Sequence, residues 1–252
     1  MSALHIVAIL GAGVVAGAIN AVVGSGTLFT FPVLLAVGYA PVVANVSNTV
    51  GLVPGSAAGA VGYRDELVGQ RGRAVRLGTA SVLGGIAGGV ALLELPASAF
   101  KHIVPVFIVI ALVLILAQPR ISRALAQRRS PGHRRERAGP LTIAAVFASG
   151  VYGGYFGAAQ GILLISILAL GLDDDLQRLN ALKVVLAGLV NLVAGVLFVF
   201  AAHVAWLPAA LIAAGSIVGG VLGARGGRRL PAWALRAVIV GVGVFAIVRL
   251  VG

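Results

Sequence analysis

The chain has 252 residues, of which 60% are hydrophobic and 10% are charged. This composition excludes a water-soluble domain, because a soluble core of this size could not bury so much apolar surface. The net charge of +12 does not indicate nucleic-acid binding, because the basic residues lie in short breaks between apolar segments, as in membrane proteins.

Ten apolar segments follow one another along the chain, and most have the 17–24 residues that cross a bilayer as a helix. They cover residues 3–22, 27–37, 45–63, 75–93, 102–118, 140–157, 161–171, 179–202, 205–223 and 232–250. The first lacks a basic stretch before it and a small-residue cleavage site after it, so we interpret it as a membrane segment, not a cleaved signal. The sequence therefore predicts an all-α integral membrane protein, a polytopic helical bundle.

Two segments, 27–37 and 161–171, are short. Each follows a glycine-rich break and ends at a glycine, Gly38 or Gly171. A helix of about 11 residues is only about 17 Å long, so these segments either cross as parts of broken helices or re-enter and turn back.

Three breaks are rich in arginine: residues 64–76 carry four, residues 119–139 carry seven and residues 224–236 carry four. If both short segments cross, all three breaks face one side and place 15 arginines in the cytoplasm; if both turn back, only 11 lie there. We therefore predict that both cross, with the basic loops on the cytoplasmic side and both termini outside.

The basic break at residues 119–139 divides the chain into two parts that resemble each other. Residues 1–118 form the first transmembrane repeat, residues 119–139 a basic cytoplasmic linker and residues 140–252 the second repeat. Three glycines of the first repeat match three of the second at a constant offset of 133 positions: Gly17, Gly24 and Gly38 match Gly150, Gly157 and Gly171. About five segments per repeat is an odd number, so the second repeat would insert upside down, as in many secondary transporters.

The two glycine breaks are the first candidates for a binding site. They contribute Gly24, Ser25, Gly26 and Thr27 in the first repeat and Gln160 and Gly161 in the second. An opened backbone within a membrane must find partners or line a cavity, where free N–H groups and the positive end of the next helix attract anions. Close helix packing is the alternative, and packing alone explains small-residue motifs such as Gly84-x-x-x-Gly88.

Polar residues inside apolar segments are the second group of candidates. Asn48, Asn180 and Asn191 could line a site, or each could bridge two helices. Lys183 is the one lysine inside an apolar segment and has no acidic residue within a turn. Such a lysine usually faces a pathway and attracts anions, although it could also extend toward the interface, because it lies near the start of its helix.

Other kinds of chemistry have little support in the sequence. No acidic residue lies in the middle of a segment, and the acidic run 173–175 is explained by capping of the following helix. The four histidines are scattered without metal-ligand spacing, and the chain carries no P-loop, H-E-x-x-H or G-x-S-x-G motif. The absence of cysteine also excludes disulfides and thiolate sites. We therefore expect neither an enzyme, nor a bound metal, nor a cofactor.

Two stretches resemble a known family. Residues 17–63 (GAINAVVGSGTLFTFPVLLAVGYAPVVANVSNTVGLVPGSAAGAVGY) look like the N-terminal signature of the TauE/SafE sulfite exporter family. Residues 149–200 look like its second repeat, with an N-x-x-K element at Asn180 to Lys183. The resemblance implies a plasma-membrane permease for small anions such as sulfite, sulfoacetate or related organosulfur and carboxylate compounds. The second break, with Ala158, Ala159 and Gln160, is less rich in glycine than is usual in the family.

Taken together, these features predict a secondary transporter for a small anion. The substrate would bind near the midplane between the two breaks and cross by alternating access, driven by its own gradient or by a coupling ion, a proton or sodium. The lipid bilayer is the other expected partner, and the sequence leaves open whether the chain forms a homo-oligomer. The competing classes are an anion channel, which should show a continuous polar lining, and a non-transporting membrane scaffold.

Overall fold

The computed structural model describes residues 1–127, 138–226, 240–241, 244 and 247–248. Within these residues the fold is helical and contains no strand. The helices are α1 (Ala3–Val22), α2 (Thr27–Ala36), α3 (Pro41–Gly62), α4 (Arg71–Glu94), α5 (Ala97–Gln127), α6 (Pro140–Tyr155), α7 (Gln160–Gly171), α8 (Leu176–Ala201) and α9 (Trp206–Gly226).

The prediction of an all-α membrane bundle is confirmed. Five of the helices, α1, α4, α5, α8 and α9, are long and apolar enough to cross a membrane. The helices follow the predicted segments closely, except that α5 continues through Pro119 to Gln127, into the stretch expected to be a linker. The expected last segment, 232–250, lies almost wholly outside the described residues, as do most arginines of the breaks 119–139 and 224–236.

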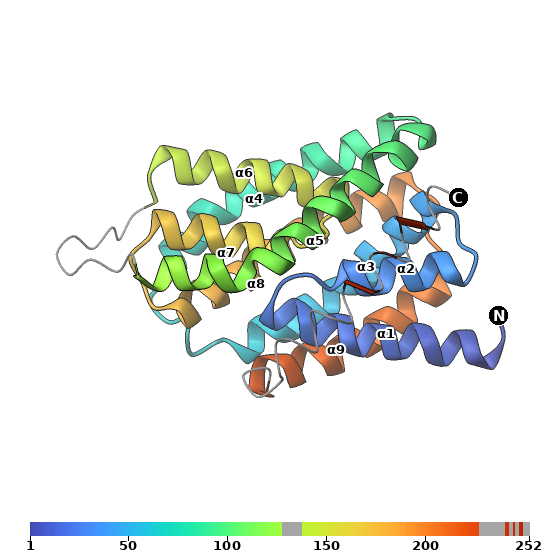
Figure 1. Cartoon of the computed structure of the whole chain (residues 1–252), viewed down its shortest axis with the longest axis horizontal. Coiled ribbons are helices and arrows are strands. Elements are labelled where there is room, and N and C mark those ends of the chain that lie inside the picture. The colour runs from blue at the N-terminus through green and yellow to red at the C-terminus, as the bar shows by residue number, and fades with distance from the viewer. Residues whose placement is uncertain (128–137, 227–239, 242–243, 245–246, 249–252) are drawn as a thin grey trace.

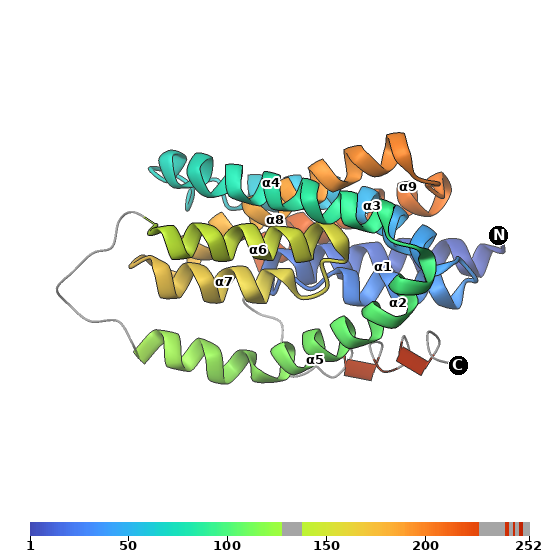
Figure 2. The same cartoon turned by 90° about the horizontal axis from the view of Figure 1, so that it is seen from above.

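Two helical hairpins enter the bundle from opposite ends (Figures 1 and 2). The short helix α2 runs back toward the end at which α1 begins, and α7 runs back toward the end at which α6 begins. The short segments are thus the returning arms of hairpins whose turns, 23–26 and 156–159, lie in the interior. Each hairpin begins and ends at the same end of the bundle, so the short segments do not continue across it as parts of broken helices, contrary to the prediction from the sequence.

Small residues allow the remaining helices to approach closely. Gly84 lies against the backbone of Phe147 and Gly88 against that of Val151, so α4 and α6 run in the same direction. A methyl group at either glycine would overlap the neighbouring backbone. The interpretation of Gly84-x-x-x-Gly88 as a packing motif is therefore confirmed.

The same kind of contact joins α9 to α1. Gly219 lies against the backbone of Val14 and Gly223 against that of Ala18, so these two helices also run in the same direction. Between these two pairs, α3 and α8 pack in opposite directions. Gly59, near the end of α3, faces Val184 near the start of α8. Gly195, near the end of α8, faces Val50 and Val53, which lie nearer the start of α3.

The described parts of the three basic breaks gather at one end of the bundle. Gly62 at the end of α3 lies against Ala224 at the end of α9. Gln70, just before α4, donates a hydrogen bond to the carbonyl of Arg178 near the start of α8 (2.9 Å). The end of α5 and the start of α6 lie at this same end in Figures 1 and 2. The side of the membrane that this end faces stays a prediction.

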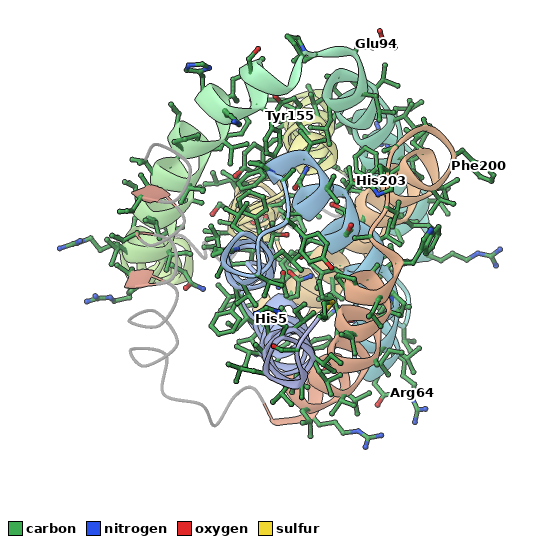
Figure 3. The ribbon with its side chains drawn as sticks, turned by 90° about the vertical axis from the view of Figure 1, so that its right-hand side faces the viewer. His5, Arg64, Glu94, Tyr155, Phe200 and His203 are labelled. Carbon is green, nitrogen blue, oxygen red and sulfur yellow. The ribbon has the colours of Figure 1, made fainter. Side chains whose placement is uncertain are left out.

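The outer face of the bundle is apolar, as lipid requires. Figure 3 looks along the bundle and shows Phe200 projecting outward, where it is 86% exposed, whereas Tyr155 lies inside with 6% exposed. Large apolar side chains elsewhere on the surface, such as Leu116 and Val218, are more than half exposed. In water these would be a liability, but in a bilayer they are the contact surface.

Candidate functional site

The turns of the two hairpins touch in the interior of the bundle. The N–H of Gly161 donates a hydrogen bond to the carbonyl of Gly24 at 3.0 Å. A Cβ atom on either residue would overlap the backbone of the other, and Gly24 also has a φ of +81°. Both positions therefore need glycine. The two glycine breaks, which were predicted from separate halves of the chain, lie in contact with each other.

The first turn leaves hydrogen-bond donors unused. Ser25 is fully buried, and within the described residues its hydroxyl has no hydrogen-bond partner. In the same part of the chain the N–H groups of Ser25 and Thr27 make no hydrogen bond either. These donors lie at the start of α2, where the helix dipole is positive, and N–H and O–H groups in such a position are of the kind that bind small anions.

The remaining N–H group of the turn is already used. The N–H of Gly26 donates to the side-chain oxygen of Asn20 on α1 at 3.2 Å, which holds the turn against the helix before it. Asn20 was not among the predicted site residues, although it lies at membrane depth close to the glycine break.

Asn48 locks the start of α2 to α3 and does not face an open space. Its amide nitrogen donates to the hydroxyl of Thr27 at 3.2 Å, and its amide oxygen accepts a hydrogen bond from the hydroxyl of Thr30. All three side chains are buried. The sequence prediction missed Thr30, whose spacing of three from Thr27 places both on one face of the short helix.

Lys183 binds the end of α1. Its ammonium donates to the carbonyls of Asn20, Ala21 and Val22 at 3.4–3.5 Å, and only 1% of the residue is exposed. These carbonyls belong to the last turn of α1, where the helix dipole is negative and a cation is stabilising. The alternative of an extended side chain that reaches the interface does not fit this burial.

Two further predicted residues lie on α8. Asn180 donates to the carbonyl of Ala21 at 3.3 Å, so it shares the end of α1 with Lys183. Asn191 is partly exposed and lies about 12 Å further along α8 than Lys183, on the face that carries Gly188 and Gly195. The structure therefore brings Asn180 and Lys183 to the turn, but not Asn191.

Side chains of its own hairpin hold the second turn in place, although the N–H groups of Ala158 and Ala159 make no hydrogen bond among the described residues. Gln160 donates from its amide to the carbonyl of Ser149 at 3.1 Å and packs on Gly153. The hydroxyl of Tyr152 donates to the carbonyl of Ala158, and Ala159 takes a left-handed conformation with φ of 58°. Gln160 thus holds the second turn to α6, and the turn meets the first through Gly161.

Aromatic side chains cover the turns on the side of α5. Phe31, which follows Thr30 on α2, packs edge to face on Phe100 and Phe156, with ring centroids 6.3 and 5.2 Å apart. Beside them the amide of Asn45 donates to the carbonyl of Tyr155 at 3.0 Å. Among the described residues the amide oxygen of Asn45 and the hydroxyl of Tyr155 have no partner. No periodicity of the sequence marks this cluster, because its members come from different helices.

The acidic run lies at the basic end of the bundle, away from the turns. Asp175 caps α8 as predicted, accepting from the N–H of Gln177 at 2.8 Å. Asp174 accepts hydrogen bonds from Arg73 and from Arg178, the latter at 3.0 Å. Burial alone would raise the pKa of Asp174, but the Asp175 N–H and the two guanidinium groups hold this pKa below its usual value.

Comparison with known proteins relates nearly the whole chain to one family of membrane proteins. The family model described as "Sulfite exporter TauE/SafE" matches residues 9–250. The "Probable membrane transporter protein YfcA" of Escherichia coli (strain K12) is 26% identical over 216 residues, which cover 85% of this chain and 76% of that protein. A "Probable membrane transporter protein" of Haemophilus influenzae is 26% identical over 221 residues, covering 84% and 81%. No solved structure matches.

Proposed function

The chain belongs to the TauE/SafE sulfite exporter family of membrane proteins, and from this premise we propose that it is a secondary transporter for a small anion. Its curated relatives carry the name of membrane transporters, which favours a transporter over an enzyme. The first turn is the observation that supports a negatively charged substrate, because a buried hydroxyl and N–H groups without partners among the described residues lie there at the positive end of α2.

The proposed anion is sulfite or a related organosulfur or carboxylate compound. A small oxyanion fits the donors of the first turn, because its oxygens accept hydrogen bonds from N–H and O–H groups at once. Lys183 supports the same choice, since its buried ammonium donates to the carbonyl of Val22, two residues before Gly24, and adds positive charge without a paired carboxylate among the described residues.

We further propose an inverted repeat, with transport by alternating access around the two turns. Support comes from the glycine contacts: Gly219 and Gly223 lie 135 positions after Gly84 and Gly88, and their partners on α1 lie 133 positions before those on α6. The opposed directions of the hairpins and of α3 and α8 agree with two repeats inserted upside down. A rocking motion of one repeat on the other would expose the turns to each side in turn.

Flux measurements in proteoliposomes test the function. Uptake of labelled sulfite, sulfoacetate and acetate is compared between the wild type and Ser25→Ala, Lys183→Met and Lys101→Met, where Lys101 is an exposed lysine of α5 that serves as the control. We expect saturable flux of at least one anion, reduced about tenfold or more in Lys183→Met and unchanged in Lys101→Met. Dissipating the proton or sodium gradient with ionophores identifies a coupling ion.

Two results would refute different parts of the proposal. Absence of flux for every small anion, with the protein folded in the vesicle, would refute the transporter for this class of substrate. Unchanged flux in both Ser25→Ala and Lys183→Met would leave the transporter and refute the site.

The natural absence of cysteine makes the proposed topology testable. Single cysteines introduced at Arg64, Arg129 and Arg228 should all react from the cytoplasmic side of the inner membrane; the latter two lie outside the described residues. Labelling of position 228 from the opposite side to position 129 would refute the predicted orientation.

A further inference from the structure

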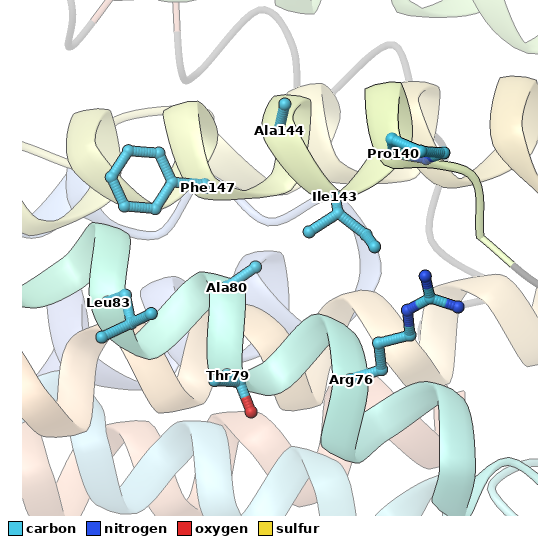
Figure 4. Close-up of a pocket in the computed structure, with 8 residues that line it drawn as sticks. All are labelled: Arg76, Thr79, Ala80, Leu83, Pro140, Ile143, Ala144 and Phe147. Carbon is cyan, nitrogen blue, oxygen red and sulfur yellow. The ribbon is translucent and has the colours of Figure 1, made fainter.

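A groove on the outer face of the bundle lies between α4 and α6. It encloses about 490 Å³, and none of its lining residues belongs to the two glycine turns. Figure 4 shows the residues that line it: Arg76, Thr79, Ala80, Leu83, Pro140, Ile143, Ala144 and Phe147. The groove therefore needs an explanation separate from the proposed transport site.

The way in which α4 and α6 pack opens this groove. The two helices touch through their backbones at Gly84 and Gly88 of α4. The groove lies on the N-terminal side of that contact, where larger side chains such as Ile143 hold the helices apart (Figure 4). Leu83 and Phe147 are 54% and 40% exposed, so the groove opens toward the surface that lipid covers.

One end of the groove carries a charge. Arg76 is exposed, and within the described residues its guanidinium makes no ion pair or hydrogen bond. Figure 4 shows Arg76 and Pro140 at one end of the groove and Leu83 and Phe147 at the other. The charged end is the one nearer the starts of α4 and α6, where the basic breaks gather. The site thus joins a cationic head to an apolar trough that opens sideways.

We propose that this groove binds one phospholipid with an anionic headgroup. The guanidinium of Arg76 receives the headgroup phosphate, because its planar fork of donors matches phosphate oxygens and stays charged at every physiological pH. An acyl chain lies along Ile143, Leu83 and Phe147. A second copy of the chain is the weaker occupant, since an apolar helix would leave Arg76 buried without an anion.

Native mass spectrometry of the full chain tests this proposal. The protein is released from membranes of equal phosphatidylglycerol and phosphatidylcholine content, and the lipids that stay bound are counted. We expect phosphatidylglycerol to be retained in preference to phosphatidylcholine. Arg76→Gln should reduce its retention about fivefold, the effect of one arginine close to a charged membrane surface.

Two matched variants make the test specific. Arg71→Gln removes another exposed arginine of α4 that does not line the groove, and it should change retention less than twofold. Ala144→Phe fills the groove from an exposed position, so the fold should persist while the bound lipid is lost.

Three outcomes would overturn the proposal. Equal losses in Arg76→Gln and Arg71→Gln would mean general attraction to a basic surface. Displacement of the lipid by millimolar inorganic phosphate, with the same dependence on Arg76, would make this a site for free phosphate. A dimer that Ala144→Phe dissociates would mean that a second copy occupies the groove. None of these results depends on transport activity.

Discussion

The two turns occupy matching places in the sequence and in the bundle, but their hydrogen bonding differs. The first turn keeps the hydroxyl of Ser25 and two N–H groups without partners among the described residues. In the second turn the N–H groups of Ala158 and Ala159 also make no hydrogen bond within these residues, but the side chains of Gln160 and Tyr152 bond to the backbone of their own hairpin, and the N–H of Gly161 donates to Gly24. We therefore propose that the first turn, with the hydroxyl of Ser25, binds the ligand and that the second turn supports it.

The comparison assigns different roles to residues that the sequence treats alike. Ser25 and Gln160 both looked like donors for an anion, but only the hydroxyl of Ser25 is free for one. The positive charge at the first turn comes from Lys183 of the other half, which binds the end of α1. A substitution in the first turn should therefore affect substrate binding, whereas one in the second should affect stability.

The largest effect is expected where the two turns touch. Gly24→Ala combines a left-handed backbone with overlap on Gly161, and we expect it to lower the free energy of unfolding by roughly 2–5 kcal/mol and to abolish flux. Gly38→Ala is the matched control, because Gly38 has a φ of +100° but open space around its Cβ position. It should cost about 1–2 kcal/mol.

Thermal unfolding in detergent micelles checks this series. Gly161→Ala, which introduces overlap without a left-handed backbone, should fall between the other two variants. If Gly24→Ala and Gly38→Ala were equally stable, the contact between the turns would contribute nothing.

The next effect separates the support from the binding turn. Gln160→Leu leaves the carbonyl of Ser149 without its buried donor and should lower stability by about 1–3 kcal/mol. Ser25→Ala removes a hydroxyl that has no partner, so the melting temperature should stay within about 1–2 °C, while the KM for the transported anion rises. A lower melting temperature in Ser25→Ala with an unchanged KM would reverse the assignment of the two turns.

A smaller effect is expected at the polar bridge between Thr30 and Asn48, which has no counterpart in the described part of the second half. Thr30→Val keeps the shape of the side chain but leaves the amide oxygen of Asn48 without its donor, at a cost of about 1–2 kcal/mol. At the matching position, 133 residues further on, α7 carries Leu163, and Leu163→Val should cost less than about 1.5 kcal/mol. Chemical denaturation of both variants measures the difference, and a larger loss in Leu163→Val would show that the bridge to Asn48 is unimportant.

The smallest effect concerns the connections that follow the short helices. The first ends at Gly38 without charge, whereas the second holds Asp174 between two guanidinium groups. Because the pKa of Asp174 is lowered on folding, its contribution is complete above the ordinary aspartate pKa and is lost as the pH falls toward the lower, folded value.

Thermal stability between neutral and acidic pH measures this contribution. We expect Asp174→Asn to lower the melting temperature at neutral pH and to reduce the loss on acidification. The same acid sensitivity in wild type and variant would mean that other carboxylates cause it.

The sequence predicted the helices better than their partners. Segment boundaries came close because apolar length and glycine are local signals, as in α2 and α7, whose starts were placed within one residue. The course of α5 past Pro119 was missed. Proline and arginine mark the end of an apolar segment, but the end of this segment is not the end of the helix. Asn191 was grouped with Asn180 and Lys183 because all three are polar, yet its position along α8 separates it from the turn.

By itself the sequence determined that the protein resides in a membrane, that it is helical and that two glycine breaks match at an offset of 133 positions. Composition and spacing carry these properties, since lipid demands apolar helices and glycine adopts left-handed turns at the lowest cost. Only the tertiary structure decided that Gly24 meets Gly161, that Lys183 binds the end of α1 and that Ser25 keeps a free hydroxyl. The physical reason is that a donor is used or free according to its neighbours in space, and helices from both halves of the chain supply those neighbours.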